Sequence, residues 1–334
     1  MDLARFPRRR YTPFYTPIER LDRLSEAVGG PVIYMKRDDM LGLTMGGNKT
    51  RKLEFLMADA LEKGADTIIT CGAVQSNHCR LTLAAAVKEG LKCHLILEQR
   101  VPNSYREFAS GNNYLYRLLG VEGIHVVDGG SDVSGEMERV AEELRAKGRT
   151  PYIIPGGGSN EIGGTGYVSC AQEILHQSFD MGVKFDHIVC TSGSTGTHAG
   201  LLTGLIGDNA NIPLTGIGIN KKKEPQRRAV YDLSQKLVKR LGIANEITMD
   251  QVVVFDDYIG EGYSRPTDAM VEAVKLVART EAILLDPVYT GKTMAGMLDL
   301  IKKGYFDGCE NVLFVHTGGS PALFAYTDTF FPSL

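Results

Sequence analysis

Lys49 stands directly after two glycines and an asparagine, within the segment 45–55. Glycines let the backbone approach a ligand closely or adopt a positive φ, and Leu53 and Leu56 begin a helical apolar spacing after the lysine. The pattern predicts Lys49 at a loop-to-helix junction. A lysine held there can lose solvent, lower its pKa and capture a carbonyl carbon. A solvated lysine in the first turn of a helix is the simpler interpretation. Only functional partners elsewhere in the chain can favour a reactive lysine over it.

A second motif, residues 191–197, is rich in Gly, Ser and Thr and lies between an apolar strand and a helix from His198. Free N–H groups and the helix dipole favour a phosphate there. It is not a Walker loop, because no Gly-Lys-Ser/Thr follows, nor is it Gly-x-Gly-x-x-Gly. The looser spacing of Gly193, Gly196 and Gly200 leaves NADP binding open, and a loop that merely turns the chain is the simpler alternative.

Two more loops complete a possible constellation. Ser76 is predicted to cap a helix after the strand 67–71, where neighbouring N–H groups could hold a carboxylate. The segment 286–292 is predicted at another strand end, with Tyr289 able to cover a flat ring. A reactive lysine, a phosphate cup, a carboxylate cup and an aromatic cover together describe a pyridoxal-phosphate (PLP) site.

Six segments then carry a family resemblance over nearly the whole chain, in the order MGGNKTRKLEFLMADAL, GAVQSNHCR, PGGGSN, SGSTGTHAG, LLDPVYTGK and HTGGSPALFAY. They resemble the family that contains ACC deaminase, D-cysteine desulfhydrase and L-cysteate sulfo-lyase. This is a fold-type-II PLP family related to the tryptophan synthase β subunit. The resemblance implies an α/β protein with two doubly wound open-sheet domains and the cofactor between them.

The resemblance also implies residue roles. Lys49 would carry the cofactor covalently, Asn77 would bond its ring hydroxyl, and no metal is expected. The expected catalytic residues are Lys49, Ser76, Tyr263 and Tyr289. The expected cofactor-binding residues are Lys49, Asn77, Ser192, Gly193, Ser194, Thr195, Gly196, Thr197, Tyr289, Thr290 and Thr317. The expected substrate-binding residues are Ser76, Asn77, His78, Arg80, Tyr105, Arg106, Tyr263, Thr290 and Thr317.

Two positions depart from the ACC deaminase branch, which carries Glu and Leu where this chain has Thr290 and Thr317. A hydroxyl cannot stabilise a protonated pyridine as a carboxylate does, so the ring becomes a weaker electron sink. Ring opening of a cyclopropane is therefore disfavoured. Elimination of a good leaving group from Cβ needs less carbanion stabilisation and is favoured.

The predicted reaction is an α,β-elimination from a small sulfur-bearing amino acid. The segments RFPRRRY, SNHCRLTLAAAVKEGLKC and SYREFASGNN resemble the sulfo-lyase branch more, so L-cysteate leads, with D-cysteine as the alternative. A sulfonate would need a donor or cation near Cβ. The candidates for it are Arg80, His78, Arg106 and Tyr105. Two other classes remain open, an NADP-dependent oxidoreductase and a non-catalytic binder of phosphorylated ligands.

The elements that must position these residues alternate between strand and helix, which predicts parallel sheets with right-handed crossovers. Strands are predicted at 32–36, 67–71, 93–97, 124–127, 152–154, 187–190, 214–219 and 311–315. Helices are predicted at 18–28, 52–64, from the Ser76 loop to 89, around 113–119, at 136–147, at 166–177 and from 198. The glycine-rich segment 155–160 predicts a boundary. Residues 52–155 would form a small domain, and residues 1–51 with 156–334 a large PLP-binding domain.

Composition narrows the class of protein. The chain has 334 residues and a formal net charge of −3, so no global basic field favours nucleic acid. No apolar run approaches the length of a membrane helix, and no signal peptide is evident, which predicts a cytoplasmic protein. The six cysteines lack zinc-site spacing and are expected to be free and mostly buried. A homodimer is expected from the resemblance.

Overall fold

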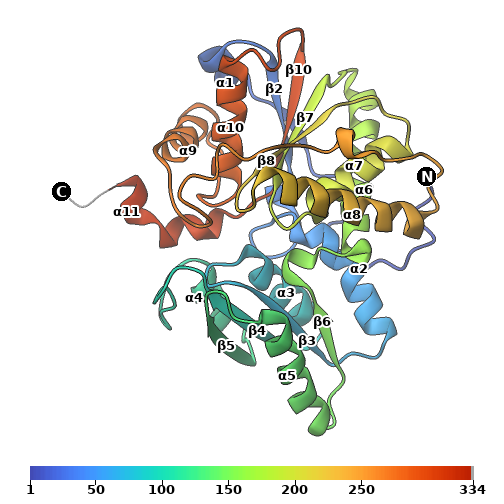
Figure 1. Cartoon of the computed structure of the whole chain (residues 1–334), viewed down its shortest axis with the longest axis vertical. Helices are drawn as coiled ribbons and strands as arrows, with labels where there is room; N and C mark the ends of the chain where they lie inside the picture. The colour runs from blue at the N-terminus through green and yellow to red at the C-terminus, as the bar shows by residue number, and fades with distance from the viewer. Residues whose placement is uncertain (332–334) are drawn as a thin grey trace.

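The computed structural model describes residues 1–331 and contains two β-sheets, each enclosed by helices (Figure 1). The larger sheet has the strand order β1-β2-β10-β7-β8-β9, in which β1 is antiparallel to β2 and the other pairs are parallel. Its strands are β1 Ile18–Arg20, β2 Val32–Arg37, β10 Asn311–His316, β7 His187–Ser192, β8 Leu214–Gly218 and β9 Val253–Phe255. The smaller sheet is wholly parallel, and its strands in order are β5 Gly123–Asp128, β4 Lys92–Gln99, β3 Thr67–Ala73 and β6 Pro151–Ile154.

Both sheets are covered on both faces. On β7, Ile188 and Cys190 belong to one apolar cluster and Val189 to another, as the two-residue period of a strand requires. On β3, Ile68 and Ile69 divide in the same way between two clusters. Parallel strands buried on both faces read as continuous apolar runs, which is why they were predictable from sequence. The expected doubly wound α/β class is confirmed.

The helices on the larger sheet are α1 Asp22–Val28, α6 Glu161–Met181, α7 Gly196–Gly207, α8 Lys223–Leu241, α9 Asp268–Glu281 and α10 Thr290–Lys302. Those on the smaller sheet are α2 Lys49–Glu62, α3 Asn77–Lys88, α4 Asn112–Leu118 and α5 Val133–Ala146. The short helix α11 spans Thr327–Phe330, and four 3-10 turns cover Asp38–Met40, Gly156–Gly158, Met249–Gln251 and Ser320–Ala325. No helix among residues 1–331 is both long and apolar enough to cross a membrane.

Close packing of α6 and α7 fixes the start of α7. A Cβ on Gly200 would lie 2.5 Å from the Gly164 carbonyl oxygen and 2.5 Å from Tyr167 Cβ. Glycine is therefore required at this crossing. The Gly200 spacing that left NADP binding open thus has a packing explanation.

Two element predictions were wrong. Residues 18–28 are not one helix, because Ile18–Arg20 pair with β2 and the helix begins only at Asp22. The chain before Asp286 is not a strand. There Ala282 ends α9 with a φ of 56°, and the Asp286 carboxylate accepts N–H groups at the start of α10.

The domain boundaries stay a prediction. The strands of the smaller sheet all fall within residues 67–154, inside the range predicted for the small domain. Helix α2 runs through the predicted boundary at 51/52 and contributes Leu53 and Leu56 to the core of the smaller sheet.

Candidate active site

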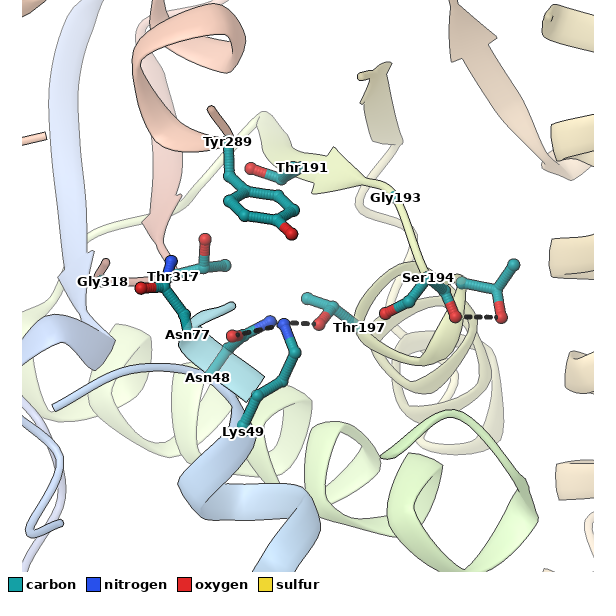
Figure 2. A pocket seen from close by; sticks show the side chains of 11 residues that line it. Asn48, Lys49, Asn77, Thr191, Gly193, Ser194, Thr197, Tyr289, Thr317 and Gly318 are labelled. Carbon is teal, nitrogen blue, oxygen red and sulfur yellow. Dashed lines mark hydrogen bonds between the residues drawn. The ribbon is translucent and has the colours of Figure 1, made fainter. Parts of the chain in front are cut away.

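Two adjoining pockets lie where β3, β7 and β10 end and where α2, α3 and α7 begin. The inner pocket is lined by Asn48, Lys49, Asn77, Thr191, Gly193, Ser194, Thr195, Thr197, Tyr289, Thr317 and Gly318 (Figure 2). The outer pocket shares Lys49, Gly193, Ser194 and Tyr289 with it and continues past Ser76, His78, Arg100 and Tyr263. Because carboxyl ends of parallel strands meet at one edge, loops far apart in the sequence converge here.

Lys49 is the first residue of α2, and the glycines before it make that placement possible. Gly46 and Gly47 have φ values of 65° and 125°, and a Cβ on Gly46 would lie 1.6 Å from the Asp39 carbonyl oxygen. The Lys49 side chain is 8% exposed, and Nζ donates a hydrogen bond of 2.9 Å to Asn48 Oδ1. Burial lowers the pKa of Lys49 to about 8, although Asp286 opposes the shift. The structure thus places a desolvated amine where the sequence predicted one.

Tyr289 covers the lysine, and Tyr263 packs against Tyr289. The ring centroid of Tyr289 lies 5.7 Å from Lys49 Nζ, and Figure 2 shows the two side chains on facing sides of the pocket. The hydroxyls of Tyr289 and Tyr263 are hydrogen-bonded to each other, with the rings edge to face at 5.9 Å. Burial raises the pKa of both tyrosines, so both keep their protons at neutral pH.

The predicted phosphate loop lies on the opposite side of the inner pocket from Asn77 and Thr317 (Figure 2). Gly193, Ser194, Thr195 and Thr197 line the pocket, and the first N–H groups of α7 have no acceptor within their own helix. These groups suit an anion. The other two predicted residues, Ser192 and Gly196, do not line the pocket but contact residues behind it.

The Ser192 hydroxyl lies 3.0 Å from His198 Nδ1 and accepts from Gln226 Nε2 at 2.9 Å. A Cβ on Gly196 would lie 2.8 Å from Lys52 Nζ and 2.9 Å from Ser159 Oγ. Gly196 therefore leaves room for a lysine that sequence reasoning missed.

Lys52 is fully buried one helical turn after Lys49. Its Nζ donates to the Gly157 carbonyl at 3.0 Å and to Ser159 Oγ at 3.3 Å, and Ser159 Oγ donates to Ser194 Oγ at 3.1 Å. Burial and the nearby Lys49 lower the pKa of Lys52 well below its ordinary value. No carboxylate among the described residues pairs with it. The three-residue spacing from Lys49 was a signal that could have identified it.

The predicted carboxylate loop is held rigidly. Ser76 caps α3, its Oγ accepting from the Cys79 N–H at 3.1 Å, and Asn77 Oδ1 accepts from Asn112 Nδ2 at 2.8 Å. The His78 ring lies 2.8 Å from Thr70 Oγ1, and burial with the nearby Lys49 and Lys52 lowers its pKa well below the ordinary value. His78 is therefore neutral at neutral pH and supplies no countercharge.

Three predicted substrate residues lie elsewhere. Arg80 is fully buried and donates to the carbonyls of Thr44 and Gly46 and, at 2.8 Å, to Asn112 Oδ1. It supports the loop before Lys49. Arg106 lines a third cavity, which shares Ala73 and Arg100 with the outer pocket, and Tyr105 packs against the core of the smaller sheet. The predicted contact of Arg80 with substrate was therefore wrong, because its donors are used inside the protein. The substrate contacts of Arg106 and Tyr105 stay predictions.

The two threonines that depart from the ACC deaminase pattern differ in placement. Thr317 lines the inner pocket, and its carbonyl accepts the Asn48 N–H at 3.0 Å. The Thr290 hydroxyl donates to Asp286 Oδ1 at 2.9 Å and accepts from the Asp286 N–H at 2.7 Å. Thr290 therefore orders the segment that carries Tyr289. Its predicted contact with the ring nitrogen stays a prediction.

A buried lysine in α10 supports the loop that carries Tyr263. Lys292 Nζ donates to the carbonyls of Ile259 at 2.6 Å and Gly262 at 2.9 Å. We expect Lys292→Met to lower the free energy of unfolding by about 1–3 kcal/mol, because two buried carbonyls lose their donor. Urea unfolding measures this loss. Lys302→Met, at the exposed end of the same helix, is the control, and an equal loss in both variants would contradict the assignment.

Comparison with known proteins places the chain in a family. A family model for pyridoxal-phosphate-dependent enzymes matches residues 10–318. The chain belongs to this family, and its cofactor is PLP. The family replaces the NADP-dependent oxidoreductase that the glycine spacing left open.

Particular relatives are similar over most of their length. A curated D-cysteine desulfhydrase of Yersinia enterocolitica is 46% identical over 325 residues, which cover 97% of both proteins. A crystal structure of an ACC deaminase homologue is 41% identical, with a TM-score of 0.90 over 98% of this chain and 96% of that chain. A PLP-dependent aspartate racemase, 16% identical with a TM-score of 0.63 over 92% and 90% of the two chains, shares the fold.

The pocket's own chemistry fits this cofactor. A desolvated lysine amine suits the PLP aldehyde, and the tyrosine ring beside it offers a face for the pyridine. The buried Lys52 ammonium, behind a helix N-terminus, suits a phosphate. We infer that Lys49 would hold the aldehyde end and that residues 193–197, with Lys52, would hold the phosphate end.

Proposed function

We propose that this protein is a PLP-dependent carbon–sulfur lyase that converts D-cysteine into pyruvate, ammonia and sulfide. The observation that carries the proposal is the buried Lys49 amine facing a pocket that continues to Ser76. The similarity to a D-cysteine desulfhydrase supports this substrate better than L-cysteate, which the sequence segments favoured. Arg80, one predicted partner of a sulfonate, is buried away from this pocket.

Different residues of the chain would carry out different steps of an elimination. Bound PLP supplies an electron sink for the charge left when an amino acid loses its Cα proton. Lys49, with a pKa of about 8, can accept that proton near neutral pH. Ser76 Oγ already accepts the Cys79 N–H, so its own proton is available to a substrate carboxylate.

The leaving group would depart toward the tyrosine pair. Tyr263 and Tyr289 keep their hydroxyl protons, and both side chains line the outer pocket. A hydroxyl there can donate a proton to sulfur as the Cβ–S bond breaks. Departure of hydrogen sulfide leaves 2-aminoacrylate, and its hydrolysis in water gives pyruvate and ammonia. The two threonines in place of Glu and Leu continue to disfavour ring opening of ACC.

L-Cysteate is a second candidate because of the charge of the outer pocket. Lys49, Arg100 and Lys221 line it, and no Asp or Glu of the described residues does. A substrate with a carboxylate and a sulfonate would suit this lining. The predicted homodimer and cytoplasmic location stay predictions.

A parallel assay tests the proposal. The purified holoenzyme is incubated with D-cysteine, L-cysteine, L-cysteate and ACC, and pyruvate, sulfide and sulfite are measured. We expect equimolar pyruvate and sulfide from D-cysteine, with the highest kcat/KM of the four substrates. Sulfite from L-cysteate without sulfide from D-cysteine would replace the lead substrate with the second candidate. Absence of pyruvate from every sulfur amino acid would contradict the elimination itself.

A further inference from the structure

Arg100 lies directly after β4 and lines the outer pocket. Its guanidinium carbon is 4.5 Å from the ring centroid of Tyr263, whose hydroxyl is hydrogen-bonded to that of Tyr289. Tyr289 in turn covers Lys49. Lys49, Tyr289, Tyr263 and Arg100 therefore contact one another in that order, and Arg100 is the cation next to the tyrosine pair.

The contacts of Arg100 leave its outer nitrogens unused. Nε donates to Glu98 Oε2 at 2.6 Å, and Glu98 Oε1 also accepts the Gly130 N–H at 3.0 Å. Among residues 1–331, neither terminal nitrogen of Arg100 has a hydrogen-bond acceptor in the protein. The ring of Tyr263 and the carboxylate of Glu98 hold the guanidinium plane, while two parallel N–H donors remain for a ligand.

We propose that Arg100 forms an anion subsite for an acidic group on Cβ of the substrate. The substrate class that it would favour is that of the second candidate, a three-carbon amino acid with a sulfonate or sulfinate at Cβ, because D-cysteine carries no acidic oxygens there. Guanidinium donors bind such oxygens two at a time. Lys221, three residues after β8, also lines this pocket and adds positive charge, while Glu98, the carboxylate that pairs with Arg100, is not part of the lining. This inference rests on the proposed function for the identity of the reacting carbon.

Binding of unreactive probes tests the subsite separately from turnover. 3-Sulfopropanoate has the carboxylate and sulfonate of cysteate but no amine, and propanoate lacks the sulfonate as well. Isothermal titration calorimetry on the holoenzyme measures both dissociation constants. We expect 3-sulfopropanoate to bind at least about ten-fold more tightly than propanoate, as charged hydrogen bonds would give.

Variants assign that preference to Arg100. Arg100→Met should reduce the preference below about two-fold, and Arg100→Lys should retain an intermediate value, because it keeps the charge but not the paired donors. Arg117→Met is the matched control, since Arg117 also stacks on an aromatic ring, Phe108, and pairs with a carboxylate, Glu107, away from the pocket. Melting temperatures of all variants verify folding.

The outcomes separate the two proposals. A preference that is absent in the unmodified enzyme, or unchanged in Arg100→Met, would overturn the subsite even if D-cysteine is converted. A preference that depends on Arg100 would support the subsite even if neither D-cysteine nor L-cysteate reacts, in which case the proposed function alone fails.

Discussion

Replacing Lys49 with alanine is expected to lower pyruvate formation by at least about a thousand-fold, because the change removes both the covalent attachment point and the proposed base. Pyruvate release under saturating substrate measures the loss. Lys63→Ala, at the exposed end of the same helix, is the control and should retain activity. Near-normal turnover of the Lys49 variant without added amine would exclude this lysine as the essential base.

The same variant should keep its fold, because the buried charge of Lys49 destabilises the cofactor-free protein at neutral pH. Because the pKa of Lys49 falls from 10.5 to about 8 on folding, the folded cofactor-free protein binds fewer protons than the unfolded chain between those values. Below pH 8 the buried charge costs about 3 kcal/mol, and this cost disappears as pH rises toward 10.5. Cofactor-free Lys49→Ala should therefore be no less stable than the unmodified protein at pH 7. Urea unfolding at pH 7 and pH 10 measures the difference, which should shift in favour of the unmodified protein at pH 10.

Arg51→Met is expected to cost about 3–5 kcal/mol of unfolding free energy, because it leaves two buried carboxylates without their shared cation. Arg51 donates to both oxygens of Asp38 at 2.7 and 2.8 Å and to Glu173 at 2.8 Å. Burial alone would raise the pKa of Asp38 and of Glu173, but Arg51 outweighs it and lowers both. Lys36 also donates to Glu173 and remains in the variant.

Urea unfolding at several pH values tests this network. The lowered pKa values mean that its stabilisation is present above about pH 4 and is lost as pH falls through the folded-state values. The deficit of Arg51→Met should therefore be largest at pH 7 and shrink in acid, where the carboxylates are protonated. Arg228→Met, which breaks an exposed pair with Asp232, should change stability much less. A loss at Arg51 no larger than that of this control would contradict the assignment.

Sequence patterns predicted what depends on local backbone chemistry. The two glycines before Lys49 predicted its loop-to-helix junction, and the Ser76 cap and the Gly-rich loop before α7 have the predicted placements. Buried parallel strands are long apolar runs, so the α/β class was readable as well. The exceptions were β1 and β9, because each has three residues that form a strand only through pairing with β2 or β8.

Side-chain direction was harder to predict. Arg80 lies one turn after the carboxylate loop, but its helix position turns it toward the loop before Lys49 instead of the pocket. Arg100 follows a strand without any motif around it, and only the packing of the segment between β9 and α9 against the end of β4 brings it beside Tyr263. Contacts between segments that are distant in sequence produce no short-range pattern of residues, so a single sequence does not reveal them.

The burial of Lys52 links the stability of the folded protein to cofactor binding. Lys52 is fully buried, donates to a carbonyl and a hydroxyl, and has a pKa lowered well below its ordinary value. An anion bound beside it would favour its charged form, so loading and folding are thermodynamically linked. A ligand that binds the folded chain alone adds RT ln(1 + [L]/Kd) to its stability. The supply of PLP would thus raise the free energy of unfolding of the protein as well as permit its turnover.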